Sequence, residues 1–369
     1  MYDIAILGAT AAGYAAACRL AKDGAAVVLL DAPGRPVESP LCDWVGQSFF
    51  SPKGLGKALA SQCGAVPFKR TCYHNTDLSQ VAPHRGRTVA GYFLHTPHLT
   101  KALRAQAKSA GVTVRTTTSF PAIDLQEQEV SLFGAKRIRA RVLLVAQGRP
   151  SEIIAELALP MRTVPLGSLA VAALDVPLGT TDAAKQVGDA LNVVQLPERT
   201  ELGMYFATKQ MLHVRVVSSS QATGMRAAEL STMIADLQSA GLLPERLALG
   251  RAAGAVWHPP AGVALELETH VAKRCLLIGT AGGFAEAVTG QTLPASVRSA
   301  LLAADVVAQA LRSDDCQGAL MRFKTVWRRS LADFIRPPNT SLRMLLPLLF
   351  ANNRIIGRFT AALLEGKNI

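Results

Sequence analysis

The sequence predicts an α/β fold in which distant pieces of the chain build one parallel sheet, an antiparallel sheet is inserted between them, and helices form the tail. Three observations predict this arrangement. Residues 2–31 have the pattern of a strand, a glycine turn, a helix and a second strand, and residues 275–311 repeat the strand, glycine turn and helix. Between them, residues 151–263 contain strand-length apolar or alternating segments separated by turn residues. We therefore expect one discontinuous Rossmann-like sheet and a second, inserted lobe.

The first unit carries the fingerprint of a dinucleotide site. Residues 3–7 form a short apolar run typical of a buried parallel strand, and residues 27–30 form a second run that ends at Asp31. Gly8 suits the tight turn after the first strand, and Gly13 suits close packing of the helix on that strand. The helix N-terminus is expected to face a pyrophosphate, and Asp31 a ribose hydroxyl. A plain strand-turn-helix is the alternative, because one glycine fingerprint alone is a weak signal.

One position departs from this fingerprint. Thr10 stands where the pattern has its middle glycine, which lets the backbone approach the pyrophosphate. The Thr10 hydroxyl is able to donate a hydrogen bond to a phosphate oxygen, but the Thr10 β-carbon leaves less space between the backbone and the pyrophosphate. We expect Thr10 and Ala12 to line the site in spite of this change.

Composition indicates a folded protein with two lobes. The chain has 369 residues, of which 49% are hydrophobic and 18% charged, so each lobe has enough residues for a core. No stretch reaches the roughly eighteen apolar residues of a membrane span, and the first apolar run has no basic leader, which predicts a cytoplasmic protein. The six cysteines include no CxxC pair, so neither a metal site nor a disulfide framework is expected.

The net charge of +12 is concentrated at the end of the chain. Residues 321–369 contain nine basic and two acidic residues, interleaved with the apolar run SLRMLLPLLFANNRIIGRFTAALL. This pattern resembles an amphipathic surface for peripheral contact with an anionic membrane or an acidic carrier. The alternative is a packed helix pair with a solvated basic face. Nucleic-acid binding is not expected, because no recognition motif accompanies the charge.

The remaining segments are assigned from their patterns. Residues 32–52, with several prolines and the patch CDWVGQSFF, predict an irregular loop over a ligand, in which Trp44 lines an active site or packs within the loop. Residues 71–94 predict polar strands, and residues 96–110 predict a helix that stops at Gly111.

Residues 140–146, with the sequence ARVLLVA, predict a buried strand that returns the chain to the parallel sheet. These patterns divide the chain into four intervals. They are residues 1–150, the first part of the nucleotide-binding domain; 151–263, a substrate domain with an antiparallel sheet; 264–315, the second part of the nucleotide-binding domain; and 316–369, a basic helical C-terminal region.

Three segments carry a resemblance to a known family. They are GATAAG followed by Asp31, LLVAQGRPS at residues 143–151, and LLIGTAGGFAEAVTGQ at residues 276–291. Together they resemble the FAD-dependent oxidoreductases of the aromatic hydroxylase superfamily, especially the branch of geranylgeranyl reductases and flavin-dependent halogenases. The resemblance implies that FAD is bound by Gly8, Thr10, Ala12, Gly13, Asp31, Gln147, Gly148, Gly279, Thr280, Gly282, Gly283 and Gly290.

Several positions differ from the family pattern. Thr280 replaces the aspartate after Gly279, Gln147 replaces the aspartate before Gly148, and Thr10 replaces the middle glycine. Each replacement leaves a hydrogen-bonding side chain without a charge. The alternative to an enzyme is therefore a non-catalytic binding protein on a flavoprotein scaffold that has weakened or lost FAD binding.

The resemblance also suggests a substrate pocket. The segment YFATK partly matches an aromatic-Phe-Pro-Lys segment of the geranylgeranyl reductase branch, but it lacks the proline. Tyr205, Phe206 and Lys209, together with Trp44, are therefore expected to line the pocket.

Proton transfer has two candidates. Glu286 follows the glycine cluster of the third family segment, and His258 lies in the turn VWHPPAG, where a structural hydrogen bond is the alternative. No serine-histidine-aspartate triad, metal-spaced histidine cluster or P-loop competes with them.

The function implied by the resemblance is that of an FAD-dependent oxidoreductase acting on a large apolar substrate, which is lipid-like, aromatic or carrier-bound. The reaction is either double-bond reduction or monooxygenation through a flavin hydroperoxide. The chain has only one glycine fingerprint with a downstream acid, so the electrons are expected to come from an external donor such as NAD(P)H or a reductase.

Overall fold

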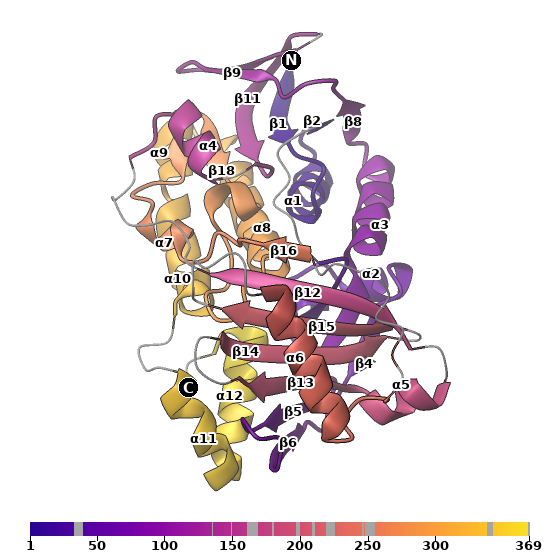
Figure 1. Ribbon diagram of the computed structural model, residues 1–369. Helices are drawn as coiled ribbons and strands as arrows, with labels where there is room; N and C mark the ends of the chain where they lie inside the picture. The colour runs from indigo at the N-terminus through magenta and orange to yellow at the C-terminus, as the bar shows by residue number, and fades with distance from the viewer. Residues whose placement is uncertain are drawn as a thin grey trace.

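A computed structural model shows two lobes that stack end to end, with the parallel sheet at one end and the last two helices of the chain at the other (Figure 1). The structure describes the whole chain except residues 33–39, 135, 149, 161–168, 179–180, 197–199, 209–210, 219–225, 246, 248–254, 338–341 and 368–369.

The first sheet joins segments from both ends of the chain. Its strands are, in spatial order, β17 (Val271–Ala272), β18 (Cys275–Leu277), β11 (Ile138–Val145), β1 (Tyr2–Leu7), β2 (Val27–Asp31) and β8 (Thr113–Thr116), with β10 (Val130–Phe133) and β9 (Ala122–Leu125) attached to β11. The strands from β18 to β8 pair in parallel. Val145 pairs with Leu7 on one side and Leu277 on the other, so β1, β11 and β18 end at the same edge. The predicted discontinuous parallel sheet is confirmed.

Three helices cover one face of this sheet. They are α1 (Ala11–Lys22), α3 (Thr96–Ser109) and α8 (Leu293–Ala310), and α1 packs against both of the others. The buried residues of α1 are mostly alanine and glycine, which lets its neighbours approach closely. On the opposite face, α4 (Pro150–Glu156) buries Ile153 and Ile154 against the strands.

A second sheet forms the other lobe. Its strands are, in spatial order, β16 (Ala255–Trp257), β12 (Ala170–Pro177), β15 (Met211–Ser218), β14 (Thr200–Thr208), β13 (Ala190–Gln195), β5 (Arg70–His74) and β6 (Val81–Arg85). All neighbours are antiparallel except β13 and β5. One face is covered by α5 (Thr181–Val187) and α6 (Arg226–Ser239). The predicted antiparallel sheet therefore forms, but β5 and β6 come from the interval assigned to the nucleotide-binding domain, because strand pairing brings them to β13.

A third, small sheet lies between the lobes. It consists of β3 (Cys42–Gly46), β7 (Gly91–His95) and β4 (Val66–Phe68), followed by the 3-10 turn η1 (Gln47–Phe50) and α2 (Lys57–Gln62). The expectation of an irregular loop was wrong for residues 42–50. Trp44 and Val45 are fully buried in a strand that pairs with β7, and this burial stabilises regular structure in spite of the preceding prolines.

The chain ends in helices, as predicted. They are α9 (Cys316–Met321), α10 (Phe323–Ile335), α11 (Leu342–Ala351) and α12 (Asn353–Glu365), and α7 (Val263–Glu266) and the turn η2 (Gly279–Gly282) precede them in the chain. Helix α10 packs on α8, whereas α11 and α12 pack beside β6 on the face of the second sheet that α6 does not cover. Within the described ranges, no helix combines the length and the apolar character needed to cross a membrane.

Candidate nucleotide-binding site

A cavity of about 290 Å³ lies where the parallel strands end. It is lined by the turn after β1, the first turn of α1, the ends of β2 and β11, the turn after β18, and the start of α8. The predicted cofactor residues that line it are Thr10, Ala12, Asp31, Gln147, Gly148 and Thr280. The carboxyl edge of a parallel sheet is the usual place for a ligand in open α/β folds, so the shared register of the strands creates this site.

A second cavity of about 420 Å³ adjoins the first. Both are lined by Ala9, Asp31, Thr96 and Thr100, and the second adds Tyr14, Pro40, Leu41, Pro97, Lys101 and Arg104. Burial raises the pKa of Tyr14, while the nearby Arg104 lowers it and Asp31 raises it. Together the two cavities give an elongated site with Asp31 at their junction.

The two outer glycines of the fingerprint are required by close packing. Gly8 has φ = +120°, and a β-carbon there would lie 2.4 Å from the Cβ of Gln147. A β-carbon on Gly13 would lie 2.0 Å from the carbonyl oxygen of Gly8. Both distances are too short for any side chain, so helix α1 starts directly against the turn after β1.

Thr10 is the N-cap of α1. Its Oγ1 accepts a hydrogen bond from the Gly13 amide at 3.1 Å and donates to the Ala146 carbonyl at 3.3 Å. With φ = −89°, the position needs no glycine for its backbone conformation. Both hydrogen bonds of the Thr10 hydroxyl are made to other groups of the protein. The backbone amides of Ala11 and Ala12, two residues that line the cavity in the first turn of α1, are therefore the donors that would bind an anion.

The end of β11 is tied to the end of β2. Gln147 donates from Nε2 to the carbonyl of Ala32 at 2.8 Å, next to Asp31. Gly148 follows with φ = +122°, in a region that favours glycine. Gln147 therefore supplies a neutral bridge between two strand ends.

The third predicted segment divides between cavity lining and packing. Gly279 has φ = +60°, and its amide donates a hydrogen bond to Ser299 Oγ at 2.9 Å. A β-carbon on Gly279 would lie 3.2 Å from the Cβ of Ala12, which is a tight contact. Thr280 lines the cavity beside Thr292 and Ser296 of the α8 N-terminal region. The segment thus holds α1 and α8 close together at the cavity.

The other glycines of this segment pack elsewhere. Gly282, Gly283 and Gly290 are not among the residues that line the two cavities. A β-carbon on Gly283 would lie 2.7 Å from the Cβ of Val263, and one on Gly290 would lie 2.7 Å from Cγ2 of Val171. Their role in this structure is close packing between segments.

A buried ion pair that the sequence did not reveal borders the first cavity. Arg215 on β15 donates from Nη1 to Asp43 Oδ1 at 2.9 Å and from Nη2 to the carbonyl of Cys42. Gln291 donates from Nε2 to the same Asp43 oxygen at 2.7 Å and to the carbonyl of Trp44 at 2.8 Å. Asp43 also lines the cavity, so this network joins the second sheet, the small sheet and the start of α8 at the site.

The predicted substrate residues that the structure describes, Trp44, Tyr205 and Phe206, are not among those lining the two cavities. Trp44 and Phe206 are fully buried, with ring centroids 5.9 Å apart, and Phe93 stacks on Phe206 at 4.6 Å. Tyr205 points to the other face of β14, where it packs in the cluster under α6. Lys209 lies outside the described residues. Successive residues of a strand point to opposite faces, so Tyr205 and Phe206 cannot line the same wall.

The two proton-transfer candidates differ in environment. Glu286 is buried, and its carboxylate accepts from the amides of Val288 and Thr289 at 2.8 and 2.6 Å and from Thr289 Oγ1 at 2.5 Å. Burial raises the pKa of Glu286, and these hydrogen bonds oppose the rise. His258 is exposed. The structure places neither residue among those lining the two cavities.

A hydrogen-bonded chain of three side chains was also missed. His213 Nδ1 lies 2.7 Å from Asp175 Oδ1, and His213 Nε2 lies 2.8 Å from Thr208 Oγ1. The His213 ring packs on Phe206, on the same face of the sheet as Arg215. The three residues lie on three neighbouring strands, so no local motif could have indicated them.

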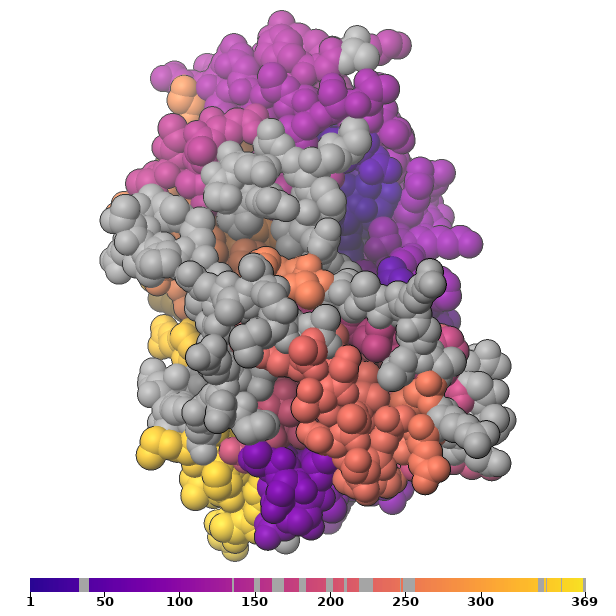
Figure 2. Space-filling model, in the orientation of Figure 1, coloured from indigo at the N-terminus to yellow at the C-terminus, as the bar shows by residue number. Residues whose placement is uncertain are grey.

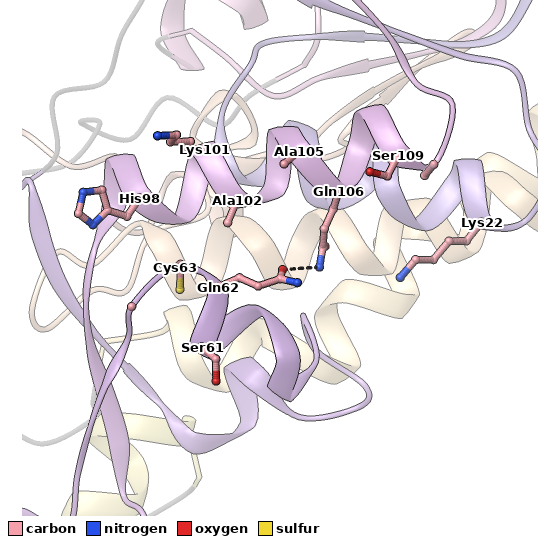
Figure 3. Close-up of a pocket in the computed structure, with 12 residues that line it drawn as sticks. Lys22, Ser61, Gln62, Cys63, His98, Lys101, Ala102, Ala105, Gln106 and Ser109 are labelled. Atoms are coloured by element: carbon pink, nitrogen blue, oxygen red, sulfur yellow. Dashed lines mark hydrogen bonds between the residues drawn. The ribbon is translucent and has the colours of Figure 1, made fainter.

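An open groove of about 970 Å³ lies between α2 and α3 (Figure 3). Gln62 from α2 and Gln106 from α3 point toward each other across it and share a hydrogen bond of 3.3 Å. Its lining includes Lys22, His98 and Lys101 and no acidic residue. Lys101 also lines the second cavity, so this residue of α3 borders both spaces.

Comparison with known proteins identifies the fold. No model of a protein family and no curated protein sequence matches the chain. Among solved structures, a geranylgeranyl bacteriochlorophyll reductase-like protein from Thermoplasma acidophilum aligns with a TM-score of 0.69 at 15% identity, over 99% of this chain and 97% of that one. The p-nitrophenol 4-monooxygenase from Pseudomonas putida aligns with a TM-score of 0.68 at 16% identity, over 99% and 95%.

A third structure contains the cofactor that the sequence implies. The halogenase PltM, in complex with phloroglucinol and FAD, aligns with a TM-score of 0.68 at 15% identity, over 99% of this chain and 87% of that one. The resemblance inferred from the three glycine-bearing segments is confirmed at the level of the fold. The chain has the fold of these solved structures, whose names are those of a reductase-like protein, a monooxygenase and a halogenase in complex with FAD.

Proposed function

We propose that the chain binds FAD in the elongated site and is an FAD-dependent oxidoreductase. The observation that carries the proposal is the cavity at the shared carboxyl edge of β1, β2 and β11, with Asp31 at its junction with the second cavity. The neighbours with FAD or with reductase and monooxygenase names support the same conclusion through the fold. The proposal assigns the cofactor to this site on the chemistry of its lining.

The residues present fit the adenosine diphosphate half of FAD. Gly8 and Gly13 leave no β-carbon between the strand and the helix, so the N-terminus of α1 reaches the cavity. The first-turn amides of Ala11 and Ala12 would hold the diphosphate, because the helix dipole favours negative charge there. Asp31 would accept a hydrogen bond from a ribose hydroxyl.

The flavin half would meet neutral hydroxyl groups. Thr280, Thr292 and Ser296 line the cavity around the start of α8, where the hydroxyls of Thr280 and Thr292 and the helix N-terminus favour an electron-rich ring edge. The Ser296 hydroxyl donates to the Phe284 carbonyl at 3.4 Å. Bound FAD would supply electron transfer to or from the substrate, and the protein would supply binding, orientation and exclusion of water. In this assignment, the hydrogen bonds from Gln291 to Asp43 and Trp44 hold the segment just before α8 in place, and this segment positions the hydroxyl groups.

For the substrate, we propose a large apolar molecule. The aromatic cluster of Trp44, Phe93 and Phe206 is buried beside Asp43, which borders the cavity, so the protein interior next to the proposed flavin site is apolar. The electron donor is external, and the cationic groove beside α3 suits an anionic donor such as NAD(P)H. Both reduction and monooxygenation fit this arrangement. Release of hydrogen peroxide during NAD(P)H oxidation in air would favour the monooxygenase, and its absence the reductase.

The first test is whether the protein carries FAD. We expect the purified protein, as isolated or after incubation with FAD, to be yellow and to show the absorbance bands of oxidised flavin. We expect Asp31→Ala to weaken FAD binding about tenfold or more, because a charge-assisted hydrogen bond contributes about 1.5–3 kcal/mol. Titration followed by flavin fluorescence measures the dissociation constant.

The matched control is Asp236→Ala, an exposed aspartate on α6 far from the site, which should leave FAD affinity unchanged. A folded, colourless wild-type protein that takes up no FAD contradicts the proposal. If Asp31→Ala and Asp236→Ala change FAD affinity equally, Asp31 does not contact FAD.

The alternative function is a non-catalytic binding protein on the same scaffold. The observation that favours it is Thr10, whose side chain stands at the position of the middle glycine and whose hydroxyl is already used by Gly13 and Ala146. In this case the site would not accept FAD in the wild-type chain.

Thr10→Gly therefore has a clear expected result. It removes the β-carbon that narrows the approach to the diphosphate, and glycine as an N-cap costs only a few tenths of a kcal/mol relative to threonine. We expect FAD affinity to rise about tenfold. Thr10→Ala is the matched control, because it loses the cap but keeps the β-carbon, and it should not gain affinity. If neither variant changes FAD binding, Thr10 does not limit the approach of the cofactor.

A further inference from the structure

The last two helices present an apolar surface that the rest of the described chain does not cover. One face of α11 packs into the core, where Leu342, Leu346 and Leu349 are buried. The opposite face exposes Met344 at 69% and Leu348 at 45% of their surface. These two residues lie one helical turn apart and therefore side by side. A helix that is apolar all around normally has a partner on both faces.

The surface lies at one end of the molecule. Figure 1 shows α11 at the lower end, beside β6 and α12, at the opposite end from the parallel sheet. In Figure 2 the yellow C-terminal helices and the purple β5–β6 hairpin form this end together. Helix α11 therefore lies at the periphery of the molecule, at the end far from the parallel sheet.

Positive charge accompanies the apolar face. Helix α11 bends into α12 at Asn352, whose side chain accepts a hydrogen bond from the Arg354 amide at 2.9 Å. Arg354 and Arg358 are exposed on the first turns of α12 and form no ion pair with other described residues. The acid of this helix, Glu365, lies at its far end and accepts from the Ser48 amide at 2.9 Å. Within the described residues of α11 and α12, the bend therefore carries apolar and cationic groups, and the acid Glu365 lies at the far end of α12.

We infer that this end of the molecule, formed by the exposed face of α11 and the first turns of α12, binds the surface of an anionic lipid membrane. Met344 and Leu348 would enter the boundary between headgroups and acyl chains, and Arg354 and Arg358 would contact the anionic headgroups. A second copy of the chain fits this surface less well, because it would bring the same arginines together. This inference does not depend on FAD binding or on the proposed reaction.

The test is flotation of the full-length protein with vesicles of phosphatidylcholine alone or with about one third phosphatidylglycerol. We expect binding to the anionic vesicles, about tenfold weaker binding to the neutral ones, and a fall in binding as salt rises, because screening shortens the reach of surface charge. Met344→Asp combined with Leu348→Asp should reduce binding to anionic vesicles at least about tenfold. Arg354→Gln combined with Arg358→Gln should reduce it about tenfold and remove the preference for anionic lipid.

Phe133→Asp is the matched control, since Phe133 is a large apolar residue exposed at 44% on β10 of the parallel-sheet end. It should leave vesicle binding unchanged. Circular dichroism and thermal unfolding check that every variant is folded. No vesicle binding by the wild type, or equal loss with the Phe133 variant, overturns the inference. A dimer of the wild type that Met344→Asp converts to a monomer, without vesicle binding, assigns the surface to a second copy and also overturns it.

Discussion

Replacing Arg215 with leucine will lower the free energy of unfolding by about 3–5 kcal/mol. Arg215 and Asp43 are each only 3% exposed, so the substitution leaves the Asp43 carboxylate buried with its cationic partner gone. Gln291 and the Trp44 amide still donate hydrogen bonds to Asp43, but neutral donors do not offset the cost of burying a charge. Urea unfolding followed by tryptophan fluorescence measures the change, since Trp44 lies under the Arg215 guanidinium at 4.6 Å.

Two controls isolate the buried charge. Arg19→Leu removes an ion pair with Asp305 whose side chains are 44% and 46% exposed, and it should cost less than about 1 kcal/mol. Adding Asp43→Asn to Arg215→Leu removes the unpaired charge and should recover part of the lost stability. If Arg215→Leu costs no more than Arg19→Leu, the ion pair does not hold the lobes together.

The sequence predicted the parallel sheet well because its signals are local. The strand, glycine turn and helix of residues 2–31 lie within one short segment. The two glycines that pack against each other, Gly8 and Gly13, are only five positions apart. The end of β11 and the turn after β18 carry glycines of the same kind. Each element could therefore be recognised without knowing its neighbours.

The buried network could not be predicted because its members come from distant segments. Arg215 and Asp43 are 172 residues apart, and Gln291 and Asp43 are 248 residues apart. Asp43 stands in a polar patch that looks like a loop, and it becomes a buried strand residue only when β7 pairs with β3. Long-range pairing of this kind has no local pattern.

The substrate pocket stays a prediction, but two of its residues, Tyr205 and Phe206, lie on opposite faces of β14. Tyr205 and Phe206 were grouped because they are adjacent in the family segment, yet adjacent residues of a strand point to opposite faces. The period of two in this segment was visible in the sequence. Phe206 shares a face with Met204, and Tyr205 packs under α6, as the burial of β14 shows.

Replacing Gly13 with alanine will disturb the site at its most crowded point. The new β-carbon would lie 2.0 Å from the carbonyl oxygen of Gly8, which is backbone and cannot rotate away, so α1 has to move from the turn after β1. Overpacking of this kind costs about 1–3 kcal/mol or more. The shift also moves the first-turn amides of Ala11 and Ala12 from the cavity, so we expect FAD affinity to fall more than tenfold.

Gly134→Ala is the matched control for this substitution. Gly134 follows β10 of the same sheet, and a β-carbon there meets no atom within 4 Å, so stability and FAD affinity should both stay unchanged. Urea unfolding and FAD titration are measured on both variants. A stable Gly13→Ala protein with wild-type FAD affinity would show that the start of α1 does not form the diphosphate site. A stable variant that has lost only FAD binding would locate the diphosphate at α1, because the fold would then tolerate a shift that the cofactor does not.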